Sequence, residues 1–166
     1  MGDCDRLRYR VEMVELDKFI KIFEGLTSAY GQTIKTDQFS EKGKHKTKSF
    51  TISNPVTKKL WREHLEGKDP ALGIVPINKE NKCKWGCIDI DTYPFDHKKF
   101  IQKLKEKNIP MIVCRSKSGG AHAFLFTKEF VPATVMRVKL KLIASAMGFA
   151  GVEIFPKQDY IRVDRG

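Results

Sequence analysis

The second half of the sequence alternates strand-like and helix-like segments in an order that few folds accommodate. Segments with strand patterns are predicted at residues 83–91, 110–114, 121–127 and 152–155. Helical periodicity fills the two long connections, residues 97–107 after an Asp96 cap and residues 132–148 after Pro132. Strand–helix–strand–strand–helix–strand is the connectivity of a split βαβ sheet. The sequence therefore predicts an α+β fold with helices packed on one face of the sheet.

The first half of the sequence gives weaker patterns. Apolar residues at helical spacing predict an N-terminal helix over residues 14–29, followed by a polar loop over residues 31–48. A strand at 49–53, a helix from an Asn54 cap to about residue 65 and a strand at 72–77 are also predicted. A last strand at 160–163 is expected to pair with residues 152–155. We expect residues 1–54 to form a helical and basic segment, or an arm, and residues 55–166 to form the main domain.

The charge of the chain favours a polyanionic partner. Thirty-one Lys and Arg residues against 20 Asp and Glu residues give a net charge of +11, and clustered cations release counterions from phosphate backbones. One run concentrates this charge, and it is either a nucleic-acid-binding arm or a solvated loop: Lys42, Lys44, Lys46 and Lys48. The absence of a long apolar run and of a secretory signal, together with four cysteines read as reduced thiols, predicts a cytoplasmic protein without a membrane partner.

Two aspartates in the first strand of the second half are candidate metal ligands. Strand side chains alternate between faces, so Asp89 and Asp91 point the same way while Ile88 and Ile90 point into the core. Parallel carboxylates repel each other, and a divalent cation such as Mg²⁺ or Mn²⁺ removes that repulsion. The alternative is a strand that ends in a polar turn, with Asp91 as a local cap.

A glycine-containing loop between the next two strands is a candidate phosphate site. Its sequence runs from Arg115 through Ser116, Lys117, Ser118, Gly119 and Gly120 to His122. Adjacent glycines let backbone N–H groups approach an anion, and the flanking cations add positive charge. The alternative is a hairpin turn in which the glycines supply positive φ and His122 is a partly buried strand residue.

A third carboxylate lies in the last predicted strand. Glu153 alternates with the apolar residues Val152 and Ile154, so it faces solvent or is held as a ligand, and Lys157 follows shortly after. Three carboxylates with a phosphate cradle are what two-metal phosphoryl transfer requires. A zinc site formed by Cys83 and Cys87 with His64 or Cys114 is the weaker interpretation, because cysteines in strands are commonly buried. Trp61 and Tyr93 are interpreted as packing residues or as base-stacking residues.

These segments together resemble a known family. The order Asp89-Ile-Asp91, then Ser118-Gly-Gly-Ala-His122, then Val152-Glu-Ile-Phe-Pro-Lys-Gln158 resembles the archaeo-eukaryotic primase superfamily. It is most similar to the primase-polymerase domains of phages, plasmids and bacterial conflict elements. The lead-in from Trp61 through Gly73-Ile-Val-Pro76 to Trp85 is similar as well, so the resemblance covers roughly residues 55–166.

The resemblance implies a DNA primase or DNA polymerase, that is, a template-dependent nucleotidyltransferase of DNA replication with an RRM-like catalytic sheet. Asp89, Asp91 and Glu153 would bind Mg²⁺ or Mn²⁺, and His122 would contact the triphosphate, with one group of helpers: Ser118, Gly119, Gly120, Arg115, Lys117 and Lys157. The implied partners are a single-stranded DNA template, nucleoside triphosphates and a helicase domain or protein, in a bacterial or phage-infected cell. Such domains usually continue past the third motif, so a larger protein is expected.

Two rival functions stay open on the residues alone, and a third is disfavoured. A metal-dependent nuclease needs the carboxylates but not a triphosphate loop. A non-catalytic single-stranded nucleic-acid-binding module would use the same kind of sheet, although paired aspartates would repel phosphate. A rolling-circle relaxase requires a second histidine beside His122, where the sequence has Phe124.

Overall fold

The computed structural model describes residues 15–39, 45–116 and 118–161. The chain falls into two compact units that divide between Val75 and Pro76, later than the division expected at residues 54 and 55. Each unit contains one antiparallel sheet, which agrees with the predicted α+β class. Within the described ranges, no helix combines the length and the apolar character that a membrane span needs.

The first unit is a three-stranded sheet with two helices. Helical residues 15–22 precede β1 (Tyr30–Phe39) and β2 (His45–Ile52), and α2 (Lys58–Leu65) leads to β3 (Ala71–Ile74). The strand order is β2-β1-β3. The core is formed by four buried residues: Leu16, Tyr30, Trp61 and Leu72. Trp61 is 6% exposed and meets Phe19 edge to face at 5.8 Å, so it is a packing residue and not a base-stacking one.

Three predictions for the first unit were wrong. The helix ends at residue 22 instead of 29, because the Leu26 N–H donates to the Val75 carbonyl and a Cβ on Gly25 would lie 2.1 Å from that oxygen. Much of the segment predicted as a polar loop lies in β1 and β2, which pair with each other. The local sequence pattern does not report this pairing. The α2 cap is Thr57 instead of Asn54, with the Thr57 hydroxyl oxygen accepting from the Leu60 N–H.

The second unit has the predicted split βαβ connectivity. Its elements are β4 (Lys82–Ile90), α3 (His97–Glu106), β5 (Met111–Arg115), β6 (Ala121–Pro132), α4 (Ala133–Ala146) and β7 (Glu153–Phe155). The sheet order β5-β6-β4-β7 places the first and third strands of the unit at the centre, as in RRM-like sheets. The strand predicted at 160–163 is absent at residues 160 and 161, and the other two residues lie outside the described part of the chain.

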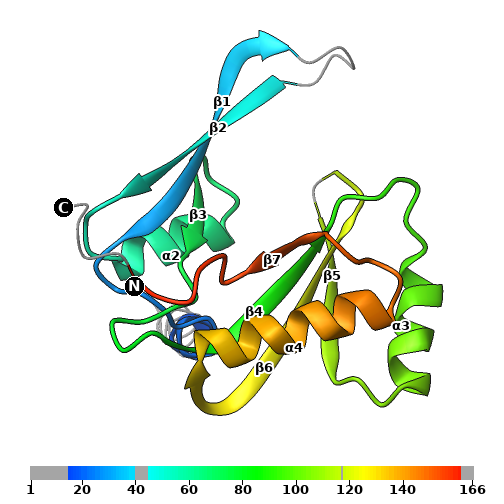
Figure 1. Cartoon of the computed structure of the whole chain (residues 1–166). Coiled ribbons are helices and arrows are strands. Elements are labelled where there is room, and N and C mark those ends of the chain that lie inside the picture. The colour runs from blue at the N-terminus through cyan, green and yellow to red at the C-terminus, as the bar shows by residue number, and fades with distance from the viewer. Residues whose placement is uncertain (1–14, 40–44, 117, 162–166) are drawn as a thin grey trace, which may run out of the picture. The chain divides into compact units, whose positions relative to one another are not determined.

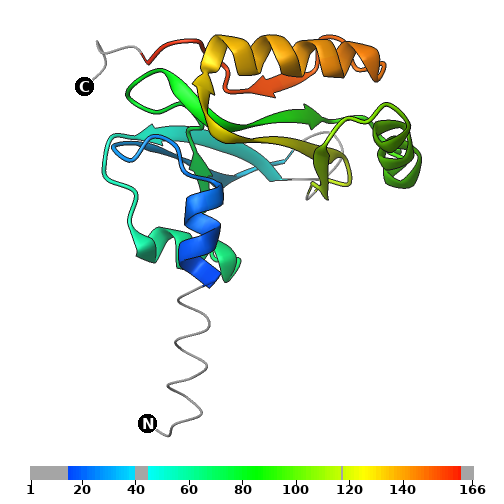
Figure 2. The same ribbon diagram turned by 90° about the horizontal axis from the view of Figure 1, so that it is seen from below.

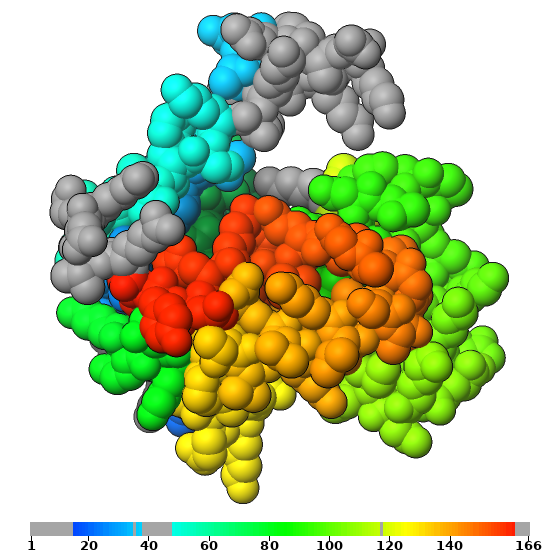
Figure 3. Space-filling view, viewed as in Figure 1, coloured from blue at the N-terminus to red at the C-terminus, as the bar shows by residue number. Residues whose placement is uncertain are grey.

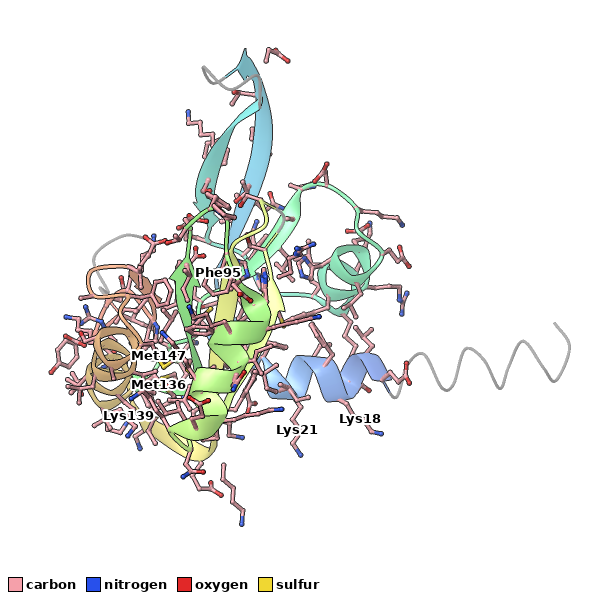
Figure 4. The ribbon with its side chains drawn as sticks, turned by 90° about the vertical axis from the view of Figure 1, so that its right-hand side faces the viewer. Lys18, Lys21, Phe95, Met136, Lys139 and Met147 are labelled. Carbon is pink, nitrogen blue, oxygen red and sulfur yellow. The ribbon has the colours of Figure 1, made fainter. Side chains whose placement is uncertain are left out.

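The core of the second unit lies between the sheet and its helices. Ile88 and Ile90 of β4 are 1% and 0% exposed, and Met136 and Leu140 of α4 pack in the same cluster. Figure 2 shows α4 lying along one face of this sheet. Figure 4 labels the buried Met136 and the exposed Lys139 of α4, and the buried Met147 that follows the helix. A Cβ on Gly86 would lie 2.7 Å from Leu140 Cδ1, so this strand glycine permits the close approach of α4. After the register shift between Cys83 and Trp85, the opposite face carries Trp85, Cys87 and Asp89.

Candidate active site

One line of strand register crosses the sheet of the second unit at the predicted site. Asp89 of β4 lies directly opposite Glu153 of β7 on one side and opposite His122 of β6 on the other. His122 in turn lies opposite Cys114 of β5. Directly opposed residues in antiparallel strands have Cβ atoms about 4.5–5.5 Å apart. Strand pairing therefore brings together an aspartate, a histidine and a glutamate that are far apart in the sequence.

Asp89 has an incompletely satisfied carboxylate. Its side chain is 20% exposed, and Oδ1 is buried without a hydrogen-bond partner among the described residues. Nε2 of His122 lies 3.4 Å from this oxygen, which is too long for a good hydrogen bond and permits ionic attraction when the imidazole is protonated. An orphaned, buried carboxylate oxygen is costly, and a ligand that coordinates it removes that cost.

The pKa of Asp89 is raised above its ordinary value, chiefly because burial disfavours the charged form. His122 and Lys157 oppose this shift, whereas the negative charges of Asp91 and Glu153 add to it. The neighbouring cations therefore do not overcome the cost of burying the ionised carboxylate beside two further acids. Such a site favours the binding of a cation.

Asp91 follows the end of β4 and is held by a chain of hydroxyl groups. The Tyr93 hydroxyl donates to Asp91 Oδ1 at 2.8 Å and is hydrogen-bonded to the Ser118 hydroxyl at 2.7 Å. Ser118 Oγ lies 3.3 Å from Ser116 Oγ. These bonds connect the second candidate carboxylate to the candidate phosphate loop. Sequence reasoning missed this role of Tyr93, for which its position two residues after Asp91 was the available signal.

The loop between β5 and β6 is a tight hairpin turn. The Ser116 N–H donates to the Gly120 carbonyl at 2.9 Å, and the Gly119 N–H donates to the Ser116 carbonyl at 3.0 Å. Gly119 has a φ of 95°, as the hairpin interpretation expected. The Gly119 N–H is already hydrogen-bonded within the turn. The exposed group at the surface of the loop is Ser118. Gly120 is buried, and it allows β6 to approach the Ile90 carbonyl.

Glu153 and Lys157 form an ion pair at the edge of the site. Their charged atoms are 2.6 Å apart, and the two side chains are about half exposed. Lys157 Nζ also lies 4.9 Å from the centre of the Phe155 ring. Asp159, a competing carboxylate, is instead paired with Arg137 at 2.6 Å. Glu153 is thus the acid of this segment that is aligned with Asp89.

Several predicted site residues are exposed away from the Asp89–His122–Glu153 register line or lie outside the described residues. Arg115 is exposed at the end of β5, opposite Ala121. Lys117, Lys42 and Lys44 lie outside the described residues, and of Lys46 only the backbone, within β2, is described. Lys48 is exposed on β2 in the first unit.

The thiols do not support a zinc site. Cys83 and Cys87 are buried, and burial raises the pKa of Cys83 to about 11 and that of Cys87 further. A zinc-binding thiol requires the opposite shift, because thiolate is the ligand form. In the described part of the chain, no three His, Cys, Asp or Glu residues form a group that could hold a metal ion together.

The carboxylates nevertheless fit Mg²⁺ or Mn²⁺. Such ions use hard oxygen ligands and bind through one or two carboxylates together with substrate phosphates, so a complete protein cage is not required. Asp89 offers an orphaned buried oxygen, and Asp91 and Glu153 raise its pKa through their negative charge. The donor set of carboxylate oxygens therefore matches the chemistry of a hard divalent cation.

Comparisons with known proteins identify one family. The family described as "TOTE conflict system, Archaeo-Eukaryotic Primase domain" matches residues 17–165. The match thus includes most of the first unit as well as the second, and it extends further towards the N-terminus than the motifs quoted from the sequence. No curated protein matches the chain.

Proposed function

The chain belongs to the archaeo-eukaryotic primase domain family of TOTE conflict systems, and we propose that it is a template-dependent nucleotidyltransferase. In this proposal it adds NTPs or dNTPs to a nucleic-acid strand on a single-stranded DNA template. Membership of the family supports a primase-type transferase in general. The polymerase reaction and the assignment of its residues are the parts that the proposal adds.

The alignment of Glu153, Asp89 and His122 on three adjacent strands carries the proposal. Nucleotidyl transfer needs carboxylates that hold divalent cations and a positive group that holds the triphosphate. We assign Asp89 and Asp91 to the cations, Glu153 to the side of the attacking 3′-hydroxyl, and His122 with Ser118 to the phosphates. The bound Mg²⁺ or Mn²⁺ would supply charge neutralisation at the attacking and leaving oxygens.

The sheet geometry supports this division of roles. Asp89 is fixed by β-pairing on both sides, so its position is set without a ligand. His122 is 43% exposed in its side chain and therefore accessible to an anionic substrate. Lys157, about half exposed beside Glu153, is a further cation for the phosphates. A site with its residues on rigid strands meets the tolerance that catalysis requires.

A matched pair of substitutions tests the proposal. Glu153→Gln keeps shape and removes charge, and we expect it to abolish strand synthesis while retaining much of the nucleotide binding through the two aspartates. Asp159→Asn makes the same chemical change in the pair with Arg137, and we expect activity to persist. The measurement is incorporation of labelled ATP and dATP on a single-stranded template with Mg²⁺ or Mn²⁺. Synthesis by Glu153→Gln contradicts the assignment.

The same assay separates the principal rival. A metal-dependent nuclease would shorten the labelled template, depend on Asp89 and bind no triphosphate. Nucleotide binding without template, measured by calorimetry, therefore distinguishes the two enzymes. Absence of triphosphate binding together with template cleavage would overturn the transferase proposal in favour of the nuclease.

A further inference from the structure

The first unit extends a two-stranded ribbon beyond its sheet. β1 pairs with β3 only from Tyr30 to Thr33, whereas its pairing with β2 continues through Ile34 and Lys35. Figure 1 shows β1 and β2 continuing past the end of β3. Among the described residues, this outer part has no third strand. Two-stranded ribbons are only marginally stable by themselves, so a bound partner would stabilise this outer part.

One face of the ribbon is apolar and cationic. Tyr30 and Ile52 begin this face in the core of the unit. The next residues outward are exposed: Phe50 by 38% and Ile34 by 41%, with Lys48 opposite Ile34. Lys48 Nζ lies 5.1 Å from the centre of the Phe50 ring. The core face of the sheet thus continues into solvent as an aromatic, aliphatic and cationic strip.

The other face of the ribbon differs in chemistry. It carries small and hydroxyl residues, with Thr33 Oγ1 and Ser49 Oγ 2.9 Å apart. In the sequence, residues 40–48 contain a single acid, Glu41, and four lysines: Lys42, Lys44, Lys46 and Lys48. In the described part of the ribbon, the exposed aromatic ring of Phe50 therefore lies beside the cation of Lys48 on one face.

We propose that the strip of Ile34, Lys48 and Phe50 is a binding site for single-stranded nucleic acid, with a base stacked on Phe50 and a phosphate contacted by Lys48. Every base offers a π-face to an aromatic ring, and lysines track the backbone. The choice of partner rests on the proposed function, which requires a single-stranded template. An acidic protein partner would also match the charge, but it would show no dependence on bases.

A double comparison of protein variants and oligonucleotides tests the site. The full chain is titrated with labelled oligo-dT and with an abasic strand of equal length, by fluorescence anisotropy, with EDTA and without nucleotide. The wild type is expected to prefer oligo-dT. Phe50→Leu keeps an apolar side chain without a ring, and it should lower oligo-dT affinity by about 10-fold, within the range for one stacked base, while leaving abasic binding unchanged.

Two further variants complete the design. Phe130→Leu is the matched control, because Lys84 Nζ lies 4.7 Å from that ring in the second unit, and this variant should bind both strands as the wild type does. Phe50→Trp should retain binding and show quenched tryptophan emission with oligo-dT. Equal preference for oligo-dT in Phe50→Leu and wild type overturns the inference. Asp89→Asn should keep this binding, so loss of synthesis and loss of the ribbon site are distinguishable.

Discussion

Asp89, a candidate metal ligand, lowers the stability of the folded chain when its carboxylate is ionised. Its burial raises its pKa, so as pH rises from the ordinary aspartate value of 3.8 the unfolded chain loses this proton before the folded chain does. The folded state therefore loses stability from about that pH until the folded pKa is passed, and the loss then stays constant. Carboxylates kept in such surroundings are typical of functional sites.

We therefore predict that Asp89→Asn is more stable than the wild type at pH 7 in EDTA. The asparagine cannot ionise, so its advantage should be absent below pH 3.8, grow as pH rises and then level off. Urea unfolding at pH 3.5 and pH 7 measures the difference. A wild type that is the more stable protein at pH 7 would show that the carboxylate is a structural cap.

Tyr93 is predicted to position Asp91. Tyr93→Phe removes the hydroxyl that bridges Asp91 and Ser118, and we expect synthesis to fall by roughly 2- to 10-fold, the equivalent of about 0.5–1.5 kcal/mol for one hydrogen bond. Tyr160→Phe is the control, since Tyr160 is 65% exposed. Steady-state kinetics of both variants, with melting curves, provide the measurement. Unchanged kinetics in Tyr93→Phe would remove Tyr93 from the site.

At the scale of elements, the pairing of β4 with β6 depends on one glycine. A Cβ at Gly120 would lie 2.2 Å from the Ile90 carbonyl oxygen, so Gly120→Ala must displace the start of β6 from the end of β4. We expect a loss of stability of about 1–3 kcal/mol, as for overpacked sites, together with loss of activity.

Gly31→Ala is the matched control for this prediction. Its Cβ would meet only atoms at 3.6 Å or beyond, within a strand of the first unit. We expect a change of less than about 1 kcal/mol, with either sign. Chemical denaturation of both variants makes the comparison, and equal stabilities would mean that the loop can move away from Ile90.

The helices and strands of the second unit could be predicted because the hydrophobic pattern of each segment matches the face that it buries in the fold. Alternation in β4 buries Ile88 and Ile90, and Asp96 caps α3 through the Lys99 N–H as predicted. In the first unit, β1 owes its strand conformation to β2 and β3, and no local signal in its sequence reports such partners. The candidate site shows the same difference: its three carboxylates were predicted from the sequence pattern, whereas the hydrogen bond from Tyr93 to Asp91 depends on the folded turn.

At the scale of the whole molecule, excess positive charge governs the proposed encounter with nucleic acid. We predict that affinity for single-stranded DNA falls steeply with salt, with a log–log slope of about −0.7 per phosphate neutralised. Replacement of four lysines by glutamine should flatten this slope and leave nucleotide affinity unchanged: Lys42, Lys44, Lys46 and Lys48.

A control variant with the same change in net charge tests whether the position of the lysines matters. Four lysines of α3 can be replaced in the same way: Lys98, Lys99, Lys103 and Lys105. We expect this control variant to keep a steeper salt dependence than the variant that lacks Lys42, Lys44, Lys46 and Lys48. Binding isotherms from 50 to 200 mM salt, about the range over which such contacts respond, provide the comparison. Identical slopes for both variants would assign the effect to net charge alone.

The surface of the second unit adds a feature with no assigned role. Three side chains on the outer side of α4 are more than half exposed: Val135, Val138 and Leu142. They line a shallow depression with Thr134 and Lys139, and Figure 3 shows the outer surface of α4, in yellow to orange. Substitutions here should change stability by less than about 0.5 kcal/mol, unlike substitutions at the buried Leu140.

The alignment of Glu153, Asp89 and His122 has a consequence for how the chain tolerates changes in length. Removing one residue between Trp85 and Asp89 would turn the aspartate to the helix-covered face, because side chains alternate along a strand. Removing one residue from the connection between α4 and β7 leaves that alternation intact. Deletions inside the central strand should therefore erase the site altogether, whereas deletions in that connection should only weaken it.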